Sequence, residues 1–226
     1  MAIDAALAER YQAVMGAIDE ACGRAGRSID EITTVVVTKF HPASLIEQLV
    51  ELGVRDVGEN RHQDAAPKAA ALTHLPLTWH FVGQLQSNKA RAVTEYARIV
   101  HSVDRPSIVT ALGRVERTVD VFLEVNLTDD PARGGVPPSE MMQLGELVLD
   151  QPTLRLVGVM AVAPLDEAAR AAFARLRGLS ESLRAIAPDA THISAGMSGD
   201  FADAIAEGST HLRIGAAITG KRPLQA

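Results

Sequence analysis

The chain has 226 residues, of which 47% are hydrophobic and 22% charged, and its formal net charge is −6. This composition is typical of a globular protein with one large core, and the acidic balance argues against a nucleic-acid partner, which requires clustered basic residues. No apolar run approaches the roughly 18 residues that indicate a membrane span, and the single cysteine, Cys22, excludes an intramolecular disulfide and is expected to be a packing residue.

The N-terminal segment has the spacing of a helix. Apolar residues recur at helical intervals from Ile3 to about Gly23. We expect a helix within residues 1–26 that packs on a barrel, in a single domain spanning residues 1–226. The first ten residues carry acidic side chains and no signal-peptide core, so a cytoplasmic location is expected.

From residue 32 onward, strand-like and helix-like patterns alternate. The predicted strands are Ile32–Lys39, Arg55–Glu59, Thr78–Gly83, Ile99–Val103, Val119–Leu127, Leu154–Val162, His192–Ala195 and His211–Ile218. The helical patterns between them begin near Pro42, Arg61, Ser87, Pro106, Pro138, Asp166 and Asp200. Repeated strand–helix units are typical of parallel α/β folds. Eight of them favour a single (β/α)8 TIM barrel, which leaves no edge strand. An open doubly wound sheet stays as the alternative, because periodicity does not report closure.

Lys39 ends the first predicted strand. The run before it is rich in β-branched residues and predicts a strand buried on both faces. An ammonium group that loses water at such a place is a candidate amine nucleophile, and barrel enzymes place their chemistry at the carboxyl ends of the strands. The alternative is that Lys39 only ends the strand and reaches solvent.

Two glycine-containing segments resemble phosphate-binding loops. Ser194–Asp200 leads into a predicted helix, so its backbone N–H groups and the Ser198 hydroxyl suit a dianion. Gly215 and Ala216, near the end of the last predicted strand, offer further backbone donors. Loops after the seventh and eighth strands often bind phosphate in this fold. The alternative is that the glycines serve only turns and that Ser198 caps a helix.

Arg213 and His80 both lie inside apolar strands. If Arg213 faces the barrel mouth, it can hold an anion or donate to a ring nitrogen; if it faces the helices, it is solvated or ion-paired. We interpret His80 as a core or rim histidine. The sequence shows no metal-ligand spacing and no Walker-type loop, so no metal site and no ATPase are expected.

Segments along most of the chain match a known pattern. They are Val37–Lys39, Gly58–Asn60, Trp79–Lys89, His101–Asp104, Gly158–Met160, Gly196–Ser198 and Gly208–Gly215. In these segments the chain resembles the pyridoxal phosphate-binding homeostasis proteins, the YggS/PROSC family. The resemblance implies a fold-type III barrel similar to the N-terminal domain of alanine racemase, with pyridoxal 5′-phosphate (PLP) as its cofactor.

The resemblance also implies the roles of individual residues. The implied cofactor-binding residues are Lys39, Asn60, Ser198, Arg213, Gly215 and Ala216. Lys39 would carry a Schiff base with PLP, Asn60 would lie near the ring, and the serine, the glycine and the alanine would hold the phosphate. Arg213 would face the pyridine nitrogen and keep it unprotonated, which weakens the ring as an electron sink. Two positions depart from the family pattern: Arg133 replaces a loop lysine, and Thr219 replaces an aromatic residue.

We therefore predict a non-catalytic carrier or regulator in intracellular PLP (vitamin B6) homeostasis, without significant turnover. The alternative is a PLP-dependent amino-acid racemase or decarboxylase. Racemisation needs a base on each face of the substrate. The chain ends at Ala226, without the β-domain that supplies a tyrosine base in alanine racemases, and Tyr11 and Tyr96 fall in helical segments. Apo-enzymes that depend on PLP are expected as further partners, and a monomer or weak dimer is expected.

Overall fold

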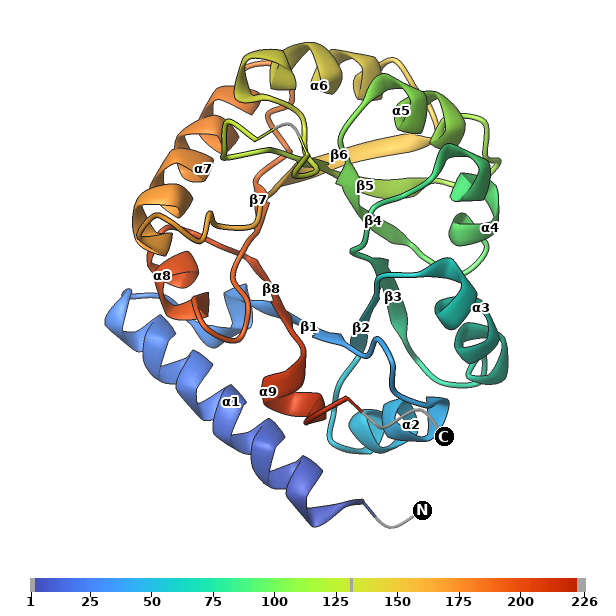
Figure 1. Ribbon diagram of the computed structural model, residues 1–226, viewed down its shortest axis with the longest axis vertical. Coiled ribbons are helices and arrows are strands. Elements are labelled where there is room, and N and C mark those ends of the chain that lie inside the picture. The colour runs from blue at the N-terminus through green and yellow to red at the C-terminus, as the bar shows by residue number, and fades with distance from the viewer. Residues whose placement is uncertain (1–2, 131, 223–226) are drawn as a thin grey trace.

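The computed structural model describes residues 3–130 and 132–222. Eight parallel strands form a closed barrel in the order of the sequence (Figure 1). The strands are β1 (Thr33–Val37), β2 (Asp56–Glu59), β3 (Thr78–Phe81), β4 (Ile99–Val103), β5 (Val119–Glu124), β6 (Leu154–Met160), β7 (His192–Ser194) and β8 (His211–Ile214). The predicted (β/α)8 barrel is confirmed, and the open doubly wound sheet is wrong, because β8 pairs with β1.

The helices surround the ring of strands (Figure 1). The α-helices are α1 (Ala5–Arg24), α2 (Ala43–Glu51), α3 (His62–Ala71), α4 (Ala90–Thr94), α5 (Pro106–Leu112), α6 (Met141–Leu149), α7 (Ala169–Leu183), α8 (Phe201–Ala206) and α9 (Ala216–Thr219). Short 3-10 helices are η1 (Ile29–Glu31), η2 (Ser87–Lys89) and η3 (Pro138–Glu140). Within the described ranges, none of these helices has the length and apolar character needed to cross a bilayer.

The N-terminal helix α1 lies on the outside of the barrel, beside α8 and α9 (Figure 1). The Asp4 side chain caps it by accepting the N–H of Ala6. Arg10 of α1 donates to the carbonyl of Ile218 in α9 at 2.9 Å, which ties the helix to the end of the barrel. The predicted domain, 1–226, includes residues outside the described ranges, and its extent stays a prediction.

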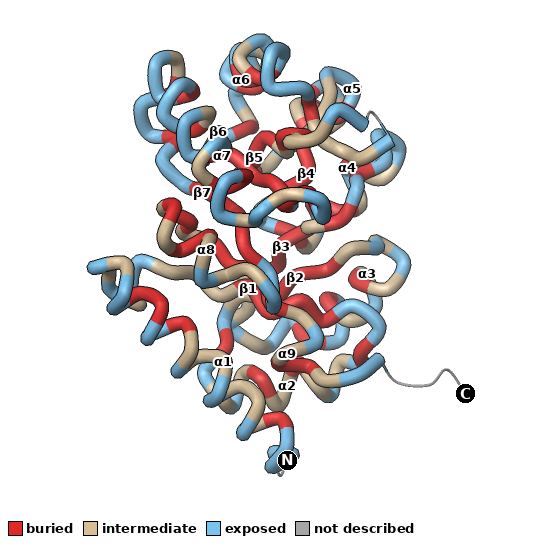
Figure 2. Tube along the Cα trace, turned by 60° about the vertical axis from the view of Figure 1, so that its left-hand side comes forward, coloured by how far each residue is buried: buried red, intermediate tan, exposed pale blue. Residues whose placement is uncertain are grey.

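The buried residues, red in Figure 2, are concentrated along the strands and the inner faces of the helices. One set of strand residues, including Val36 and Leu212, packs against the helices, where Cys22 is also buried as predicted. The other set fills the barrel lumen. There the Phe122 ring lies 4.5 Å from the His101 ring, centroid to centroid. The lumen is therefore a packed and partly polar core rather than a pore.

The predicted eighth strand, His211–Ile218, is too long. β8 ends at Ile214, and the residues that follow form α9. Two N–H groups of α9 donate to the carbonyl of Gly215 and close a helical turn. A short apolar run fits a strand or a helix equally well, so periodicity could not separate the two. As a result, Gly215 and Ala216 lie at the start of a helix rather than in a strand.

The fifth predicted strand is also too long, because the chain leaves the barrel wall after Glu124. The Asn126 amide then organises the predicted long loop. Its Nδ2 donates to the carbonyls of Asp130 and Arg133 at 2.9 and 3.0 Å, and its Oδ1 accepts the N–H of Thr128. Local hydrogen bonds therefore hold the described part of this loop in place.

Candidate functional site

The ends of β1 and β2 bring two predicted site residues together. Val37 pairs with Gly58, and Lys39 and Asn60 each follow two residues later, at one level of the barrel mouth. Gly83 packs on Asn60, because a Cβ at this glycine would meet the Asn60 carbonyl oxygen at 2.2 Å. The Oδ1 of Asn60 is buried without a hydrogen-bond partner among the described residues. Such an acceptor normally binds a water or a ligand.

Lys39 lies in a turn beyond the end of β1, and its side chain is exposed. The expectation that its amine loses water is therefore wrong, because the strand ends at Val37 and the lysine lies in the exposed turn that follows. Hydrogen bonds from Lys68 hold the backbone just before Lys39 in place. Lys68 Nζ donates to the Thr38 carbonyl at 3.0 Å and to the buried Glu59 Oε1 at 2.7 Å. This ion pair fixes the turn that presents the lysine.

The ends of β7 and β8 bring the two glycine segments together. The Arg213 N–H donates to the Gly196 carbonyl at 2.9 Å, so the residues two positions further on, Ser198 and Gly215, lie on adjacent segments of the mouth. Several backbone N–H groups at this edge have no acceptor among the described residues, including those of Ser198, Gly199, Ala216 and Ala217. The two predicted segments thus form one edge rich in donors, next to β1.

The alternative role of Ser198 as a helix cap is wrong. The residue at the cap position of α8 is Asp200, and its carboxylate accepts the N–H of Met197 at 2.6 Å. Ser198 itself is exposed. Its hydroxyl therefore faces solvent at the mouth.

The structure decides the orientation of Arg213, which sequence left open. Its side chain lies in the lumen, the residue is 6% exposed, and it donates to Ser194 Oγ at 2.7 Å and to the Ala161 carbonyl at 3.0 Å. Burial lowers the pKa of Arg213 to about 10, while Glu124 and Asp200 act in the opposite direction. The guanidinium remains a cation at neutral pH.

His80 is a core histidine. It is fully buried and lies in the lumen between Asp56 Oδ1, at 3.0 Å from its Nε2, and His101 Nε2, at 2.9 Å from its Nδ1. His211 packs against the same group, with ring centroids 6.4 Å apart. Burial is the main cause that holds the pKa of His101 well below its usual range and lowers that of His211 to about 3. The core therefore contains uncharged imidazoles.

Glu124 is a residue of the mouth that sequence reasoning missed. It lies two residues after Phe122, so both side chains point to the lumen. Burial and the nearby Asp104 raise the pKa of Glu124 to about 7, against the opposing effect of Arg213 and Arg105. Its Oε2 is buried without a partner among the described residues. The alternation of side chains along a strand could have identified this carboxyl group, because Glu124 lies two positions after Phe122 and therefore on the same face of β5.

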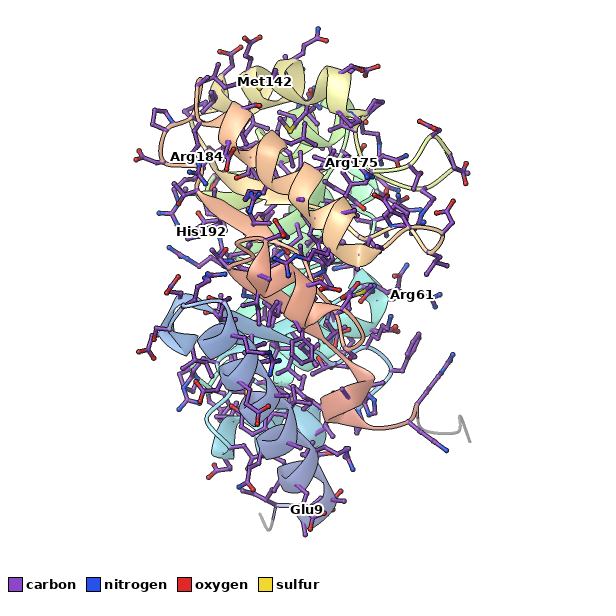
Figure 3. All side chains as sticks on the ribbon, turned by 90° about the vertical axis from the view of Figure 1, so that its left-hand side faces the viewer. Glu9, Arg61, Met142, Arg175, Arg184 and His192 are labelled. Atoms are coloured by element: carbon purple, nitrogen blue, oxygen red, sulfur yellow. The ribbon has the colours of Figure 1, made fainter. Side chains whose placement is uncertain are left out.

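Three cations surround one aromatic ring at the mouth. The Phe40 ring centroid lies 6.0 Å from Lys39 Nζ, 5.9 Å from Arg61 Cζ and 4.0 Å from Arg222 Cζ. Figure 3 shows the barrel from the side, with Arg61 at the mouth and His192 at the opposite end. The cluster gives the rim a positive potential, which attracts anions.

A hollow of about 950 Å³ lies between the loop after β5 and α7. No predicted site residue lines it, whereas Asn60 and Arg61 line a second hollow of about 520 Å³ at the mouth. Over the described ranges, no group of three or more His, Cys, Asp or Glu side chains is arranged to hold a metal ion. The convergence of polar groups, rather than hollow size, therefore defines the candidate site.

Comparison with known proteins identifies relatives along almost the whole chain. The family model described as the N-terminal domain of alanine racemase matches residues 14–223. The chain is similar to the pyridoxal phosphate homeostasis protein of Corynebacterium glutamicum, with 40% identity over 218 residues that cover 92% of this chain and 98% of the relative. The protein of the same name from Pseudomonas aeruginosa is also 40% identical, with 96% of each chain covered.

Solved structures agree with this relationship. PipY of Synechococcus elongatus, determined with PLP bound, is 33% identical and superposes with a TM-score of 0.81, covering 95% of this chain and 100% of its own. Alanine racemase of C. glutamicum is 13% identical and superposes with a TM-score of 0.72, covering 94% of this chain and 59% of its own. The second likeness shows the fold alone.

Proposed function

Because the chain belongs to the pyridoxal phosphate homeostasis proteins, within the family of the alanine racemase N-terminal domain, we propose that it binds PLP through Lys39 and holds or delivers it without turnover. The PLP in the related PipY structure supports the choice of cofactor. PLP supplies an aldehyde that condenses with a primary amine, releasing water, and a ring that withdraws electrons. Lys39 is the amine of this Schiff base, and its exposed position gives the aldehyde access.

The observation that carries the proposal is the grouping of suitable donors around this lysine. The N–H groups at the β7 and β8 ends, together with the Ser198 hydroxyl, bind the phosphate. A Cβ at Gly215 would meet no described atom closer than 3.8 Å, apart from its chain neighbours. Packing within the protein therefore leaves that side of the glycine open for a ligand to approach, and Ala216 continues the same donor edge. These features fit a phosphate group.

Asn60 and Arg213 act on the ring. Asn60 lies at the same level of the mouth as Lys39 and has an unpartnered Oδ1, so it limits how the ring turns. Arg213 approaches from below and donates to the pyridine nitrogen, which an arginine cannot protonate. A ring held in this way is a weaker electron sink than one with a protonated nitrogen.

The test is the absorption spectrum of the purified protein incubated with PLP. We expect a visible Schiff-base band that Lys39→Ala abolishes and that the control Lys89→Ala, at the rim in η2, preserves. A band of equal intensity in the Lys39→Ala protein would contradict the assignment of Lys39 as the Schiff-base amine.

One observation favours the alternative, in which an amino acid is turned over. Glu124 combines a pKa of about 7 with a place in the mouth near Arg213, which suits a general acid or base. Exchange of amino-acid α-protons in deuterated water distinguishes the two functions. A carrier exchanges the α-protons of added amino acids no faster than free PLP does, whereas enzyme-like exchange that Glu124→Gln abolishes would establish turnover.

Delivery of PLP requires a recipient, and we expect apo-enzymes that depend on PLP. Four exposed apolar residues on the loops around the mouth support a protein contact there, Phe40, Val162, Leu165 and Met197. Leu165 is the most exposed of them, at 95%. In a transfer assay, Leu165→Ser should slow activation of an apo-enzyme by the PLP-loaded protein and leave PLP binding unchanged. Equal rates for both proteins would argue against this contact.

A further inference from the structure

A continuous chain of hydrogen-bonded side chains runs through the barrel lumen and ends at Arg213. Arg213 Nη1 lies 2.7 Å from Ser194 Oγ, which lies 2.8 Å from His101 Nδ1. His101 Nε2 lies 2.9 Å from His80 Nδ1, and His80 Nε2 lies 3.0 Å from Asp56 Oδ1. Arg213, Ser194 and both histidines are buried, and only the Asp56 side chain, 29% exposed, reaches solvent at the amino end of the barrel.

With both imidazoles neutral, the chemistry of the two ends sets the direction of every hydrogen bond along this series of side chains. A guanidinium only donates and an ionised carboxylate only accepts. The Ser194 hydroxyl therefore accepts from Arg213 and donates to His101 Nδ1. His101 Nε2–H then donates to His80 Nδ1, and His80 Nε2–H donates to Asp56. In this order the proton of each ring lies on Nε2.

The surroundings of His101 agree with a neutral ring. Burial is the largest cause that holds the pKa of His101 well below its usual range, and His80, His211 and Arg213 add to it. Phe122 stacks on His101 and supplies no hydrogen bond. The Nδ1 of His211 lies 2.9 Å from Thr210 Oγ1, outside the chain. Each ring nitrogen of His80 and His101 thus has one partner, and all four are used.

Arg213 has no direct counter-ion among the described residues. No carboxylate of these residues lies within ion-pair distance of it; Glu124 and Asp200 act only at longer range. A buried cation without a contacting anion needs polarisable partners. The lumen chain supplies them, because each of its hydrogen bonds points away from the guanidinium and toward the Asp56 carboxylate.

We propose that Asp56, His80, His101 and Ser194 are positioning residues, which hold the Arg213 guanidinium in the orientation that faces the pyridine nitrogen of PLP. The identity of the ligand rests on the proposed function, whereas the series of hydrogen bonds from Asp56 to Arg213 does not. A group at the far end of the barrel would thereby influence a cofactor that it never touches.

The first experiment determines the tautomers of the two histidines in the absence of any cofactor. Nitrogen-15 NMR of the cofactor-free protein at neutral pH should show His80 and His101 as neutral rings protonated on Nε2 and not on Nδ1. An Nδ1–H tautomer or an imidazolium at either residue would overturn the proposed order of hydrogen bonds.

The second experiment measures PLP affinity and the absorption maximum of bound PLP in two variants. Asp56→Asn keeps an acceptor but removes the charge, and Ser194→Ala breaks the chain next to Arg213. We expect PLP to bind about fivefold or more weakly in each, with the absorption maximum displaced in the same direction in both. The matched control is Asp120→Asn, a carboxylate that pairs with Arg155 instead of the chain, and it should match the unmodified protein.

The outcomes separate the two proposals. If the unmodified protein binds PLP and Asp56→Asn leaves both affinity and spectrum unchanged, the positioning role is wrong and the proposed function stands. If the unmodified protein does not bind PLP, the proposed function fails. The NMR result alone then tests the proposed order of hydrogen bonds between Asp56 and Arg213. Should Ser194→Ala fail to fold, Asp56→Asn decides, because its side chain is partly exposed.

Discussion

At the scale of single residues, the most unusual feature is the set of imidazoles inside the barrel. His80, His101, His192 and His211 lie around Phe122, with ring centroids between 4.5 and 6.5 Å apart for the recorded pairs. A protonated imidazole is expensive to bury. The folded protein therefore keeps the buried His101 and His211 neutral, and this links its stability to pH.

The direction of this linkage follows from the pKa of His211. Burial lowers it from 6.5 to about 3 in the folded state, while the unfolded chain takes up the proton near 6.5. The stabilising effect is complete above that pH and is lost as the pH falls from 6.5 toward 3. We expect the free energy of unfolding in urea to fall by about 1.4 kcal/mol per pH unit for each such group, with His101 adding to His211.

The measurement compares the pH slope in two variants. His211→Asn should make the slope between pH 6.5 and 5 clearly smaller, because it removes one titrating group. His74→Asn, at an exposed histidine of the described surface, serves as the control and should leave the slope as it was. An unchanged slope in His211→Asn would show that the lumen histidines do not control acid stability.

At the scale of elements, β6 shows how tightly the barrel wall is packed. Gly158 pairs with His192 of β7, and a Cβ at this glycine would meet the His192 carbonyl oxygen at 1.7 Å. The pairing of β5 with β6 also shifts in register between Val121 and Phe122. Close backbone approach therefore explains a glycine in the middle of this strand.

The corresponding prediction compares two glycine substitutions. Gly158→Ala should lower the free energy of unfolding by about 2–4 kcal/mol, because the neighbour is backbone and cannot move aside. Gly16→Ala, at an exposed position of α1 with no atom within 4 Å of the added Cβ, should raise it by about 1 kcal/mol. Denaturant titration of both proteins checks this, and a neutral Gly158→Ala would contradict the close approach of β6 and β7.

At the scale of the whole molecule, closure of the barrel brings the proposed site together. The ends of β7, β8, β1 and β2 are adjacent only because β8 pairs with β1. In an open sheet with β1 at one edge and β8 at the other, the phosphate donors and Lys39 would lie far apart. Ligand binding at this seam should therefore stabilise the entire fold.

The prediction at this scale concerns thermal stability. A ligand that binds only the folded state stabilises it by about 2.7 kcal/mol at a free concentration of 100 times its Kd. We expect PLP to raise the unfolding temperature, and pyridoxal, which lacks the phosphate, to raise it less. Lys39→Ala should reduce the shift with PLP. Equal shifts with PLP and pyridoxal would contradict a phosphate site at the β7 and β8 ends.

Local patterns predicted the number and order of the strands and the residues that follow them. β-branched runs such as Val35–Val37 indicate strands from nearest neighbours alone. Parallel strands then bring their carboxyl ends to one rim, so Lys39, Asn60 and Ser198 could be assigned to a common site without a contact map. Short apolar runs were assigned wrongly where the strand and helix periods fit equally well. After Ile214, for example, a strand was predicted and the structure has a helix.

The sequence by itself determined which chemical groups reach the mouth, because strand order and direction follow from local periodicity. Only the tertiary structure decided how those groups are used. It closed the barrel, exposed Lys39, turned Arg213 into the lumen and brought His101 within 2.8 Å of Ser194, 93 residues away in the chain. Orientation, burial and hydrogen-bond partners depend on contacts between distant segments, and a periodic pattern carries no information about them.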